Sequence, residues 1–145
     1  GNIKPLSEYC VNDYDALVLP GGMGAAQNWS DYAFCGEKMS VNSEVANAIK
    51  QTHSANKPIA ALCIAPMILA KVLGDKNPTL TLGSDCQAAK DAIALGCNHK
   101  ICNATEVAID EKNKLLTAPA YMVATRISQI FEGSDNLIQA LYNMI

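Results

Sequence analysis

The sequence PIAALCIAPMILAKVLG, at positions 58–74, is the clearest structural signal in the chain. An apolar run led in by Pro58 stops at Cys63, and Pro66 then opens a second apolar run with helical spacing that ends at Gly74. This pattern predicts a buried strand, a sharp turn and a helix, with Cys63 at the turn.

A cysteine at such a corner has two interpretations. The free N–H groups and the dipole of the new helix would favour the thiolate of Cys63 over its thiol, which makes Cys63 a candidate nucleophile. Cysteine is also among the most buried residue types, so the alternative is a small apolar filler between strand and helix. The strand–cysteine–helix pattern alone is too short to decide between the two.

Length and composition indicate one domain over residues 1–145. Hydrophobic residues make up 50% of the chain and charged residues 17%, which is typical of a compact globular protein. The net charge of -3 gives no reason to expect nucleic acid or an anionic membrane as a partner, and no apolar run approaches a membrane span. The chain starts with Gly1 in a polar stretch, which suits a fragment or a processed product.

The spacing of the six cysteines does not suit a metal site. No two of them form a Cys-x-x-Cys pair, and the close pair Cys97 and Cys102 has no second pair to complete a zinc site. His99 lies between these two, which leaves a structural site one ligand short. We therefore expect no metal, and reduced thiols in a reducing compartment.

A strand followed by a glycine-rich loop precedes the cysteine unit. Residues 16–19 are four consecutive apolar residues, which suits a central parallel strand covered on both faces. The loop at residues 20–26 contains three glycines that would let its backbone approach a ligand or expose an N–H group. It matches neither the dinucleotide-binding nor the P-loop fingerprint.

The rest of the chain alternates helices and strands. The pattern predicts, in order, a helix through residues 41–49, the 58–74 unit, a strand at 79–82, a helix through 88–95, a hairpin of strands 106–110 and 114–117, a helix through 123–130, and a last helix capped by residues 133–135. This order is typical of an α/β sandwich with a mostly parallel sheet.

In such a sheet, ligands bind outside the carboxyl ends of the strands. Three loops are expected to share that edge, namely residues 21–22, Cys63 and residues 118–120. A cysteine, backbone donors and a proline-shaped wall would then meet in one place.

Three motifs carry a resemblance to a known family. They are LVLPGGMGAAQN at 17–28, ALCIAP at 61–66 and LTAPAYM at 116–122. In this order and spacing they resemble the ThiJ/PfpI superfamily of class I glutamine-amidotransferase-like proteins. Within it the chain looks most similar to the ElbB branch, named for enhancing lycopene biosynthesis in bacteria, which has mitochondrial relatives in animals.

The resemblance implies a flavodoxin-like three-layer sandwich, usually a homodimer, with a nucleophile-elbow cysteine at Cys63. It also implies an oxyanion hole made by backbone N–H groups near Gly22 and Ile64. Gly21 and Pro119 would line the pocket. Tyr121 is a further candidate for the pocket wall, with packing in the core as the alternative.

The activity that the resemblance implies is the conversion of glyoxal to glycolate without glutathione or any cofactor, or a related deglycase activity. The substrate would be a small aldehyde. A thiolate adds to the aldehyde, backbone donors hold the oxyanion, and a nearby acid or base moves a proton between the two carbons.

The sequence departs from the family pattern in two ways. Family members carry a preceding segment with the first strand, a helix and a glutamate that bonds the cysteine, and we expect this chain to lack that N-terminal strand and helix. Protease-like and amidotransferase-like members have a histidine beside or near the cysteine, whereas Ile64 follows Cys63, so we expect neither peptidase nor glutaminase activity. His99 is then the remaining candidate base, although a lone loop histidine is more often at the surface.

Two other hypotheses remain open at this point. In one, the protein is a redox sensor or interaction protein in which Cys63 is reversibly oxidised and a partner surface changes. In the other, the fold is a scaffold with a buried, inert Cys63. We expect a cytoplasmic protein, or a mitochondrial one if the source is eukaryotic.

Overall fold

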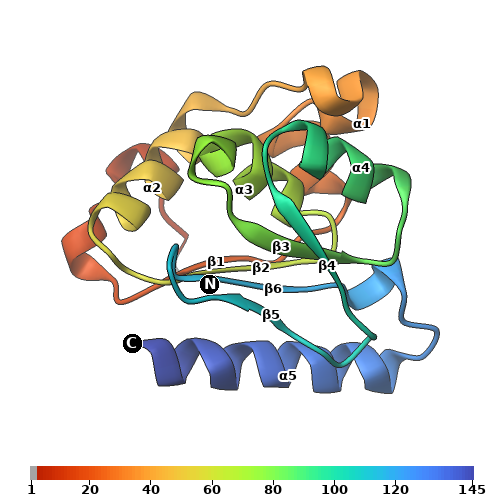
Figure 1. Cartoon of the computed structure of the whole chain (residues 1–145). Helices are drawn as coiled ribbons and strands as arrows, with labels where there is room; N and C mark the ends of the chain where they lie inside the picture. Colours follow the sequence, from red (N-terminus) through yellow and green to blue (C-terminus); the bar gives the residue numbers. More distant parts are fainter. Residues whose placement is uncertain (1–2) are drawn as a thin grey trace.

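A computed structural model describes residues 3–145, and its strands and helices alternate along the chain (Figure 1). The strands are β1 (Leu17–Leu19), β2 (Ile59–Leu62), β3 (Thr79–Gly83), β4 (Asn98–Ile101), β5 (Ala108–Asp110) and β6 (Leu115–Ala118). The helices are α1 (Tyr32–Cys35), α2 (Ser43–Ser54), α3 (Pro66–Leu73), α4 (Gln87–Ala94) and α5 (Ile127–Met144). Short turns of 3₁₀ and π type connect several of them.

The central sheet has the strand order β1-β2-β6-β5. Strands β1 and β6 both run parallel to β2, and β5 is antiparallel to β6. Strands β3 and β4 form a second, parallel pair, and this pair lies beside β6, where the Thr81 N–H donates to Thr117 Oγ1 at 2.9 Å. The predicted sandwich, its mostly parallel sheet and the hairpin of β5 and β6 are confirmed.

Helices cover the two faces of the sheet unequally. Figure 1 shows α2, α3 and α4 on one side and α5 alone on the other. Strand β2 contributes side chains to the cores on both faces of the sheet. Ile59 and Ala61 belong to the core on the α3 side, and Ala60 and Leu62 belong to the core on the α5 side. A central parallel strand buried on both faces is what its continuous apolar sequence predicts.

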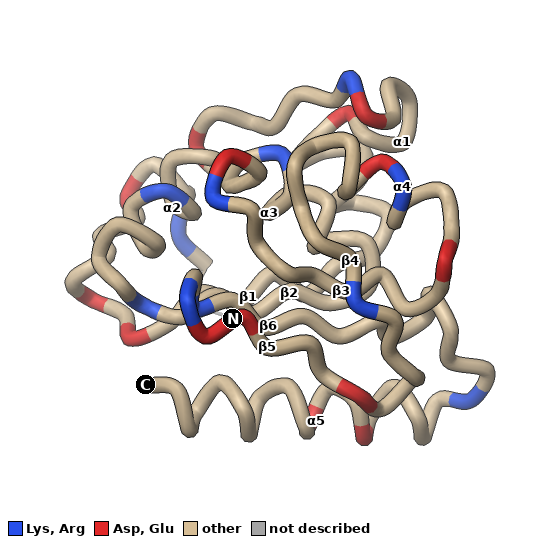
Figure 2. The backbone as a smooth tube through the Cα atoms, viewed as in Figure 1, with Lys and Arg blue, Asp and Glu red and all other residues tan. Residues whose placement is uncertain are grey.

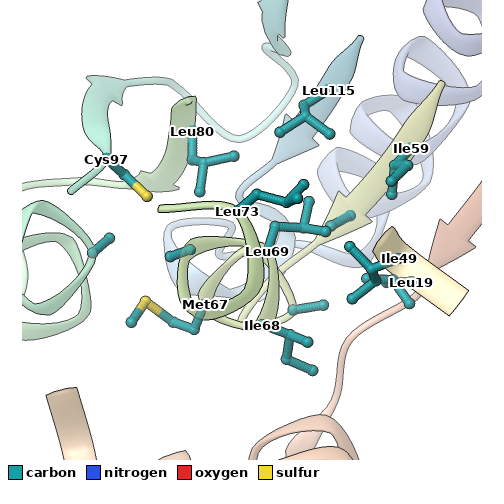
Figure 3. Close-up of a cluster of buried hydrophobic side chains, with 14 of the residues drawn as sticks. Leu19, Ile49, Ile59, Met67, Ile68, Leu69, Leu73, Leu80, Cys97 and Leu115 are labelled. Atoms are coloured by element: carbon teal, nitrogen blue, oxygen red, sulfur yellow. The ribbon is translucent and has the colours of Figure 1, made fainter. Parts of the chain in front are cut away.

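Helix α3 is the centre of the larger core (Figure 3). Pro66 opens the helix, where its missing N–H costs nothing. Met67, Ile68 and Leu69 are each no more than 1% exposed and pack between the sheet and helices α2 and α4. Burying this helix on nearly every side fixes the position of the turn that precedes it.

The predicted break near residue 133 is wrong, because α5 runs without interruption through it. A Cβ at Gly133 would lie 2.5 Å from the Ala104 carbonyl oxygen. Gly133 therefore allows the helix to approach the loop before β5 closely and does not end it. Val123 lies before the helix, in the turn that follows β6.

The predicted central position of the first strand is also wrong. Among the described strands, β1 pairs with β2 alone and forms an edge of the sheet. Val18, on the α5 side, is 39% exposed. The apolar run indicated a strand that can be buried on both faces, and the structure leaves one face and one edge open.

Strand β4 was not predicted. Its four residues, NHKI, are mostly polar and exposed because the strand pairs with β3 on one side only. No alternating or continuous apolar pattern marks such an edge strand in the sequence.

Candidate active site

Cys63 occupies the corner between β2 and α3 that the sequence predicted. Its φ is 58°, in the left-handed region that non-glycine residues rarely adopt. Two backbone bonds hold the corner, from the Cys63 N–H to the Ala118 carbonyl at 2.9 Å and from the Ala65 N–H to the Leu62 carbonyl at 3.0 Å. A strained residue held by its surroundings is a common feature of active sites.

The thiol of Cys63 differs from the thiols in the core. Cys63 is a free, half-buried cysteine, whereas Cys97 and Cys102 are buried. Burial raises the pKa of Cys97 to about 12, which keeps that thiol protonated and unreactive. Part of Cys63 reaches solvent, and the rest packs against the core on the α5 side.

The glycine loop after β1 lies directly against the cysteine. Gly21 has a φ of 86°, and a Cβ there would lie 2.6 Å from the Leu62 carbonyl oxygen and 3.1 Å from the Cys63 Cβ. The neighbouring Gly22 also has a positive φ, of 85°, but a Cβ there would meet nothing within 4 Å. Gly21 therefore permits close approach to Cys63, while Gly22 borders open space.

The backbone amides of Gly22 and Ile64 have no acceptor among the described residues. The N–H groups of Gly22 and Ile64 donate no backbone hydrogen bond, although the Gly22 and Ile64 carbonyls accept from Ala25 and Met67. The Ile64 amide also lies at the N-terminal end of α3, where the helix dipole favours negative charge. These are the two amides that the resemblance assigned to an oxyanion hole, and that role remains a prediction.

The loop after β6 completes this edge of the sheet. Leu62 is opposite Ala118 in the parallel register, so Pro119 and Ala120 follow next to the cysteine corner. Pro119 is buried, and Ala120 is a second non-glycine residue here with a positive φ, of 44°. The side chain of Tyr121 is 66% exposed, so it does not pack in the core; its role in a pocket wall remains a prediction.

His99 lies on β4, and its ring has a structural partner. Its Nε2 accepts a hydrogen bond from the Leu82 N–H at 3.1 Å, where the ladder between β3 and β4 is irregular. Burial lowers the pKa of His99 from its ordinary value, partly offset by the charge of Asp85. The neutral ring therefore carries its proton on Nδ1. Two strands, β6 and β3, lie between His99 and the strand of Cys63, so its role as a base remains a prediction.

Sequence reasoning missed the contribution of β3. Gly83 ends this strand with a φ of 91°, and a Cβ there would lie 2.5 Å from Val123 Cγ1 and 3.0 Å from Pro119 Cβ. The end of β3 thus supports the loop that carries Pro119. The signal available in the sequence was Gly83 itself, a glycine directly after the predicted apolar strand at 79–82.

Neither a metal-binding cluster nor a membrane-spanning helix is found among the described residues. In the part of the chain that the structure describes, no three His, Cys, Asp or Glu side chains come together in a way that could hold a metal ion. Among the described helices, none combines the length and the apolar character needed to cross a membrane.

Comparison with known proteins now identifies the family. A sequence model of the DJ-1/PfpI family matches residues 4–120, which include Cys63 and all three edge loops. The chain belongs to the DJ-1/PfpI family. The ThiJ/PfpI resemblance and the flavodoxin-like fold inferred from the motifs are confirmed.

Similar proteins come from animals and bacteria. The chain is 35% identical to the mitochondrial ES1 protein homolog of Rattus norvegicus and 34% identical to the mitochondrial glutamine amidotransferase-like class 1 domain-containing protein 3 of Homo sapiens, in each case over 99% of its length. It covers 57% and 56% of those proteins, so it spans little more than half their length.

A solved structure with the same arrangement is an isoprenoid biosynthesis protein with an amidotransferase-like domain from Ehrlichia chaffeensis. The TM-score is 0.85 at 27% identity, over 97% of this chain and 64% of that one. Drosophila melanogaster DJ-1beta is more distant, with a TM-score of 0.52 at 23% identity, and shares the fold.

Proposed function

We propose that this DJ-1/PfpI family member is a cofactor-independent enzyme of glyoxalase or deglycase type that acts on glyoxal or related small aldehydes through the Cys63 thiolate. The observation that supports this most is the corner itself. A half-buried cysteine with a φ of 58° lies against Gly21 of the glycine loop, and the amides of the next residues, Gly22 and Ile64, have no acceptor among the described residues. That arrangement suits a nucleophile whose adduct carries a negative oxygen.

The reaction proposed for glyoxal balances without an external oxidant. The Cys63 sulfur adds to one aldehyde carbon, and the resulting oxygen anion accepts hydrogen bonds from the amides of Gly22 and Ile64 before it is protonated to a hemithioacetal. A proton then moves from this carbon to its neighbour, so one carbon is oxidised to a thioester while the other is reduced to an alcohol. Water cleaves the thioester, which releases glycolate and the thiol.

The proton transfer between the two carbons needs a base. The described residues of the cysteine corner and the glycine loop beside it are glycine or apolar. Of this chain's residues, we propose His99 for this step, and because two strands lie between it and the strand of Cys63, it would act through bridging water and not by direct contact with the substrate. Its Nε2 lone pair would first have to be released from the Leu82 N–H, so this is the part of the proposal most easily disproved.

The same corner argues against hydrolysis of peptides or glutamine. Ile64, which follows Cys63, has an apolar side chain that cannot accept or donate a proton. We therefore propose that the protein has neither peptidase nor glutaminase activity.

The test is glycolate formation from glyoxal by the purified chain, its Cys63→Ser variant and its Cys35→Ser variant. Cys35 is an exposed cysteine on α1 and serves as the matched control. We expect turnover by the wild type and by Cys35→Ser, and a rate at least about a hundredfold lower for Cys63→Ser.

A wild-type protein that makes no glycolate would contradict the proposal. If peroxide then oxidised Cys63 rapidly in the same protein, the redox-sensing alternative would be favoured instead. A third result, equal turnover in all three variants, would place the chemistry at another residue.

We propose a mitochondrial location if the source is eukaryotic, because the rat and human relatives are named as mitochondrial proteins, and a cytoplasmic one otherwise.

We further propose that the protein forms a homodimer. Sedimentation equilibrium over a range of concentrations would test the dimer directly.

A further inference from the structure

Strand β3 is held near its end by side chains. Three successive N–H groups, of Thr81, Leu82 and Gly83, donate in that order to Thr117 Oγ1 at 2.9 Å, His99 Nε2 at 3.1 Å and Thr81 Oγ1 at 3.0 Å. They lie where the register of β3 with β4 shifts. A bulge of this kind is uncommon in parallel pairs, and it bends the strand. The three side chains therefore hold β3 in a shape that backbone pairing alone would not give it.

Two of these acceptors are threonine hydroxyls deep in the sheet. Thr81 and Thr117 are each 0% exposed. Strands β2, β3 and β6 carry no charged residue, and threonines are their only polar side chains (Figure 2). A buried N–H group that loses its acceptor is costly. Removing either hydroxyl would leave such a group in β3, and the strand can avoid that only by moving.

Thr117 lies one residue before the point where β6 meets the cysteine corner. Ala118 follows it, and the Ala118 carbonyl accepts from the Cys63 N–H at 2.9 Å. A shift of β6 at Thr117 would therefore be passed directly to the backbone of Cys63. The hydrogen bond from β3 to the Thr117 hydroxyl opposes such a shift.

Thr81 supports the same loop from the side of β3. Its hydroxyl accepts from the N–H of Gly83, which holds the last residue of the strand. Gly83 in turn lies against the loop after β6, since a Cβ there would be 3.0 Å from Pro119 Cβ. The contacts thus lead from Thr117 through β3 and return to Pro119, two residues further along the chain.

We propose that Thr117 and Thr81 are positioning residues for the chemistry of Cys63. They act through the backbone, by holding the Ala118 carbonyl and Pro119 in place beside the corner. Misplacement of reacting groups by about 1 Å can lower a rate about a hundredfold. The expected effect on turnover rests on the proposed function, whereas the expected effect on the Cys63 backbone does not.

The opposite end of β3 supplies a matched control. The Thr79 N–H donates to Asp110 Oδ2 at 2.8 Å, so a side chain also ties the first residue of β3 to β5. Asp110 is 9% exposed and pairs with Leu115, the first residue of β6. Cys63 lies beyond the other end of these strands. A change at Asp110 therefore weakens the attachment of β3 away from the cysteine corner.

The variants are Thr117→Val and Thr81→Val, which keep the side-chain shape and remove the hydroxyl, Thr117→Ser, which keeps the hydroxyl, and Asp110→Ala as the control. One measurement is kcat and KM for glycolate formation from glyoxal. The other is the exchange rate of the Cys63 amide hydrogen relative to that of the Leu69 amide, by NMR. The Leu69 amide, in the enclosed helix α3, reports opening of the whole core. Circular dichroism verifies that each variant is folded.

We expect Thr117→Val to lower kcat at least about tenfold while KM changes less than about twofold, because positioning is lost and binding is not. The relative exchange rate of the Cys63 amide should rise at least about tenfold as its bond to the Ala118 carbonyl weakens. Thr81→Val should act in the same direction, and Thr117→Ser should restore both quantities to within about threefold of the wild type. Asp110→Ala should lower the free energy of unfolding and leave both quantities within about threefold.

The inference would be overturned by a wild-type kcat or a wild-type Cys63 exchange rate in the two valine variants. Equal effects from Asp110→Ala would also overturn it, because the hydroxyls would then contribute stability alone, and so would a failure of Thr117→Ser to restore the wild-type values. If Thr117→Val does not fold, Thr81→Val decides by the same measurements. If the wild type makes no glycolate, the proposed function fails, and the exchange of the Cys63 amide still decides this inference.

Discussion

Strands β1 and β2 have similar sequences and lie side by side, but their surroundings differ. The residues of β2 are at most 9% exposed, with partners on both edges and a core on both faces. Strand β1 has one partner and a core on one face, and Val18 remains 39% exposed on the other. A continuous apolar run therefore indicates that a strand can be covered on both faces. It does not indicate whether the described residues cover both faces.

The same contrast separates the two helical layers. Helix α3 is enclosed, whereas α5 has one flank packed, one flank apolar and open, and a polar outer face. The cysteine corner belongs to the enclosed region, since β2 and α3 define it. Substitutions in the two layers, at the cysteine corner and at His99 test this division.

The largest effect is expected for Leu69→Ala in α3. Leu69 is 0% exposed, so the substitution leaves a cavity in the larger core and should lower the free energy of unfolding by about 2 to 5 kcal/mol. The matched change in the open layer is Phe131→Ala, whose side chain is 75% exposed, with an expected loss below about 1 kcal/mol. Urea denaturation measures both, and similar losses would contradict the division into closed and open layers.

The glycine pair beside Cys63 offers a second comparison. Gly21→Ala should lower the free energy of unfolding by about 2 to 3 kcal/mol, because the backbone has a positive φ and the new Cβ meets the Leu62 carbonyl oxygen. Gly22→Ala has the same backbone strain with open space around it and should cost about 1 kcal/mol.

Thermal and urea unfolding of both glycine variants would be compared with the rate of Cys63 alkylation by iodoacetamide. We expect Gly21→Ala to change that rate and Gly22→Ala to change it less. An equal cost for the two variants would mean that the close approach of Gly21 to the corner is not important.

Strain at the nucleophile position gives a third test. Glycine adopts a φ of 58° without the steric penalty of a Cβ, so Cys63→Gly should be about 1 kcal/mol more stable than Cys63→Ala. Both variants lack the sulfur, so the comparison isolates the backbone. If Cys63→Ala were the more stable, the corner would not be strained.

The smallest effect concerns pH and His99. Burial lowers the pKa of His99 in the folded state, and its neutral Nε2 accepts from the Leu82 N–H. The neutral His99 ring therefore contributes to the free energy of unfolding above the ordinary histidine pKa of about 6.5. This contribution is lost as the pH falls from 6.5 through the lower pKa of the folded state.

The free energy of unfolding should therefore decline between pH 7.5 and 5 by more in the wild type than in His99→Gln. The glutamine carbonyl can accept the same N–H but does not titrate in this range. Parallel pH profiles for the two proteins would show that His99 does not contribute.

The sequence predicted the part of the site that is local. Pro58, Cys63 and Pro66 mark a strand, a corner and a helix within a few residues, and the glycines after β1 mark a loop without side chains. It did not predict that Gly83 would support Pro119, because these residues come from strands far apart in the chain. Nor did it predict that the His99 ring would fill an irregularity between β3 and β4.

The α/β order, the position of the cysteine corner and the family could be inferred from the amino-acid sequence, because apolar periodicity, prolines and glycines act over short distances. Packing determines which described strand lies at the edge, why Gly133 lies inside a helix instead of ending it, and why one flank of α5 is open. Those outcomes depend on which surfaces meet, and a strand or helix of given apolar pattern is compatible with several such arrangements.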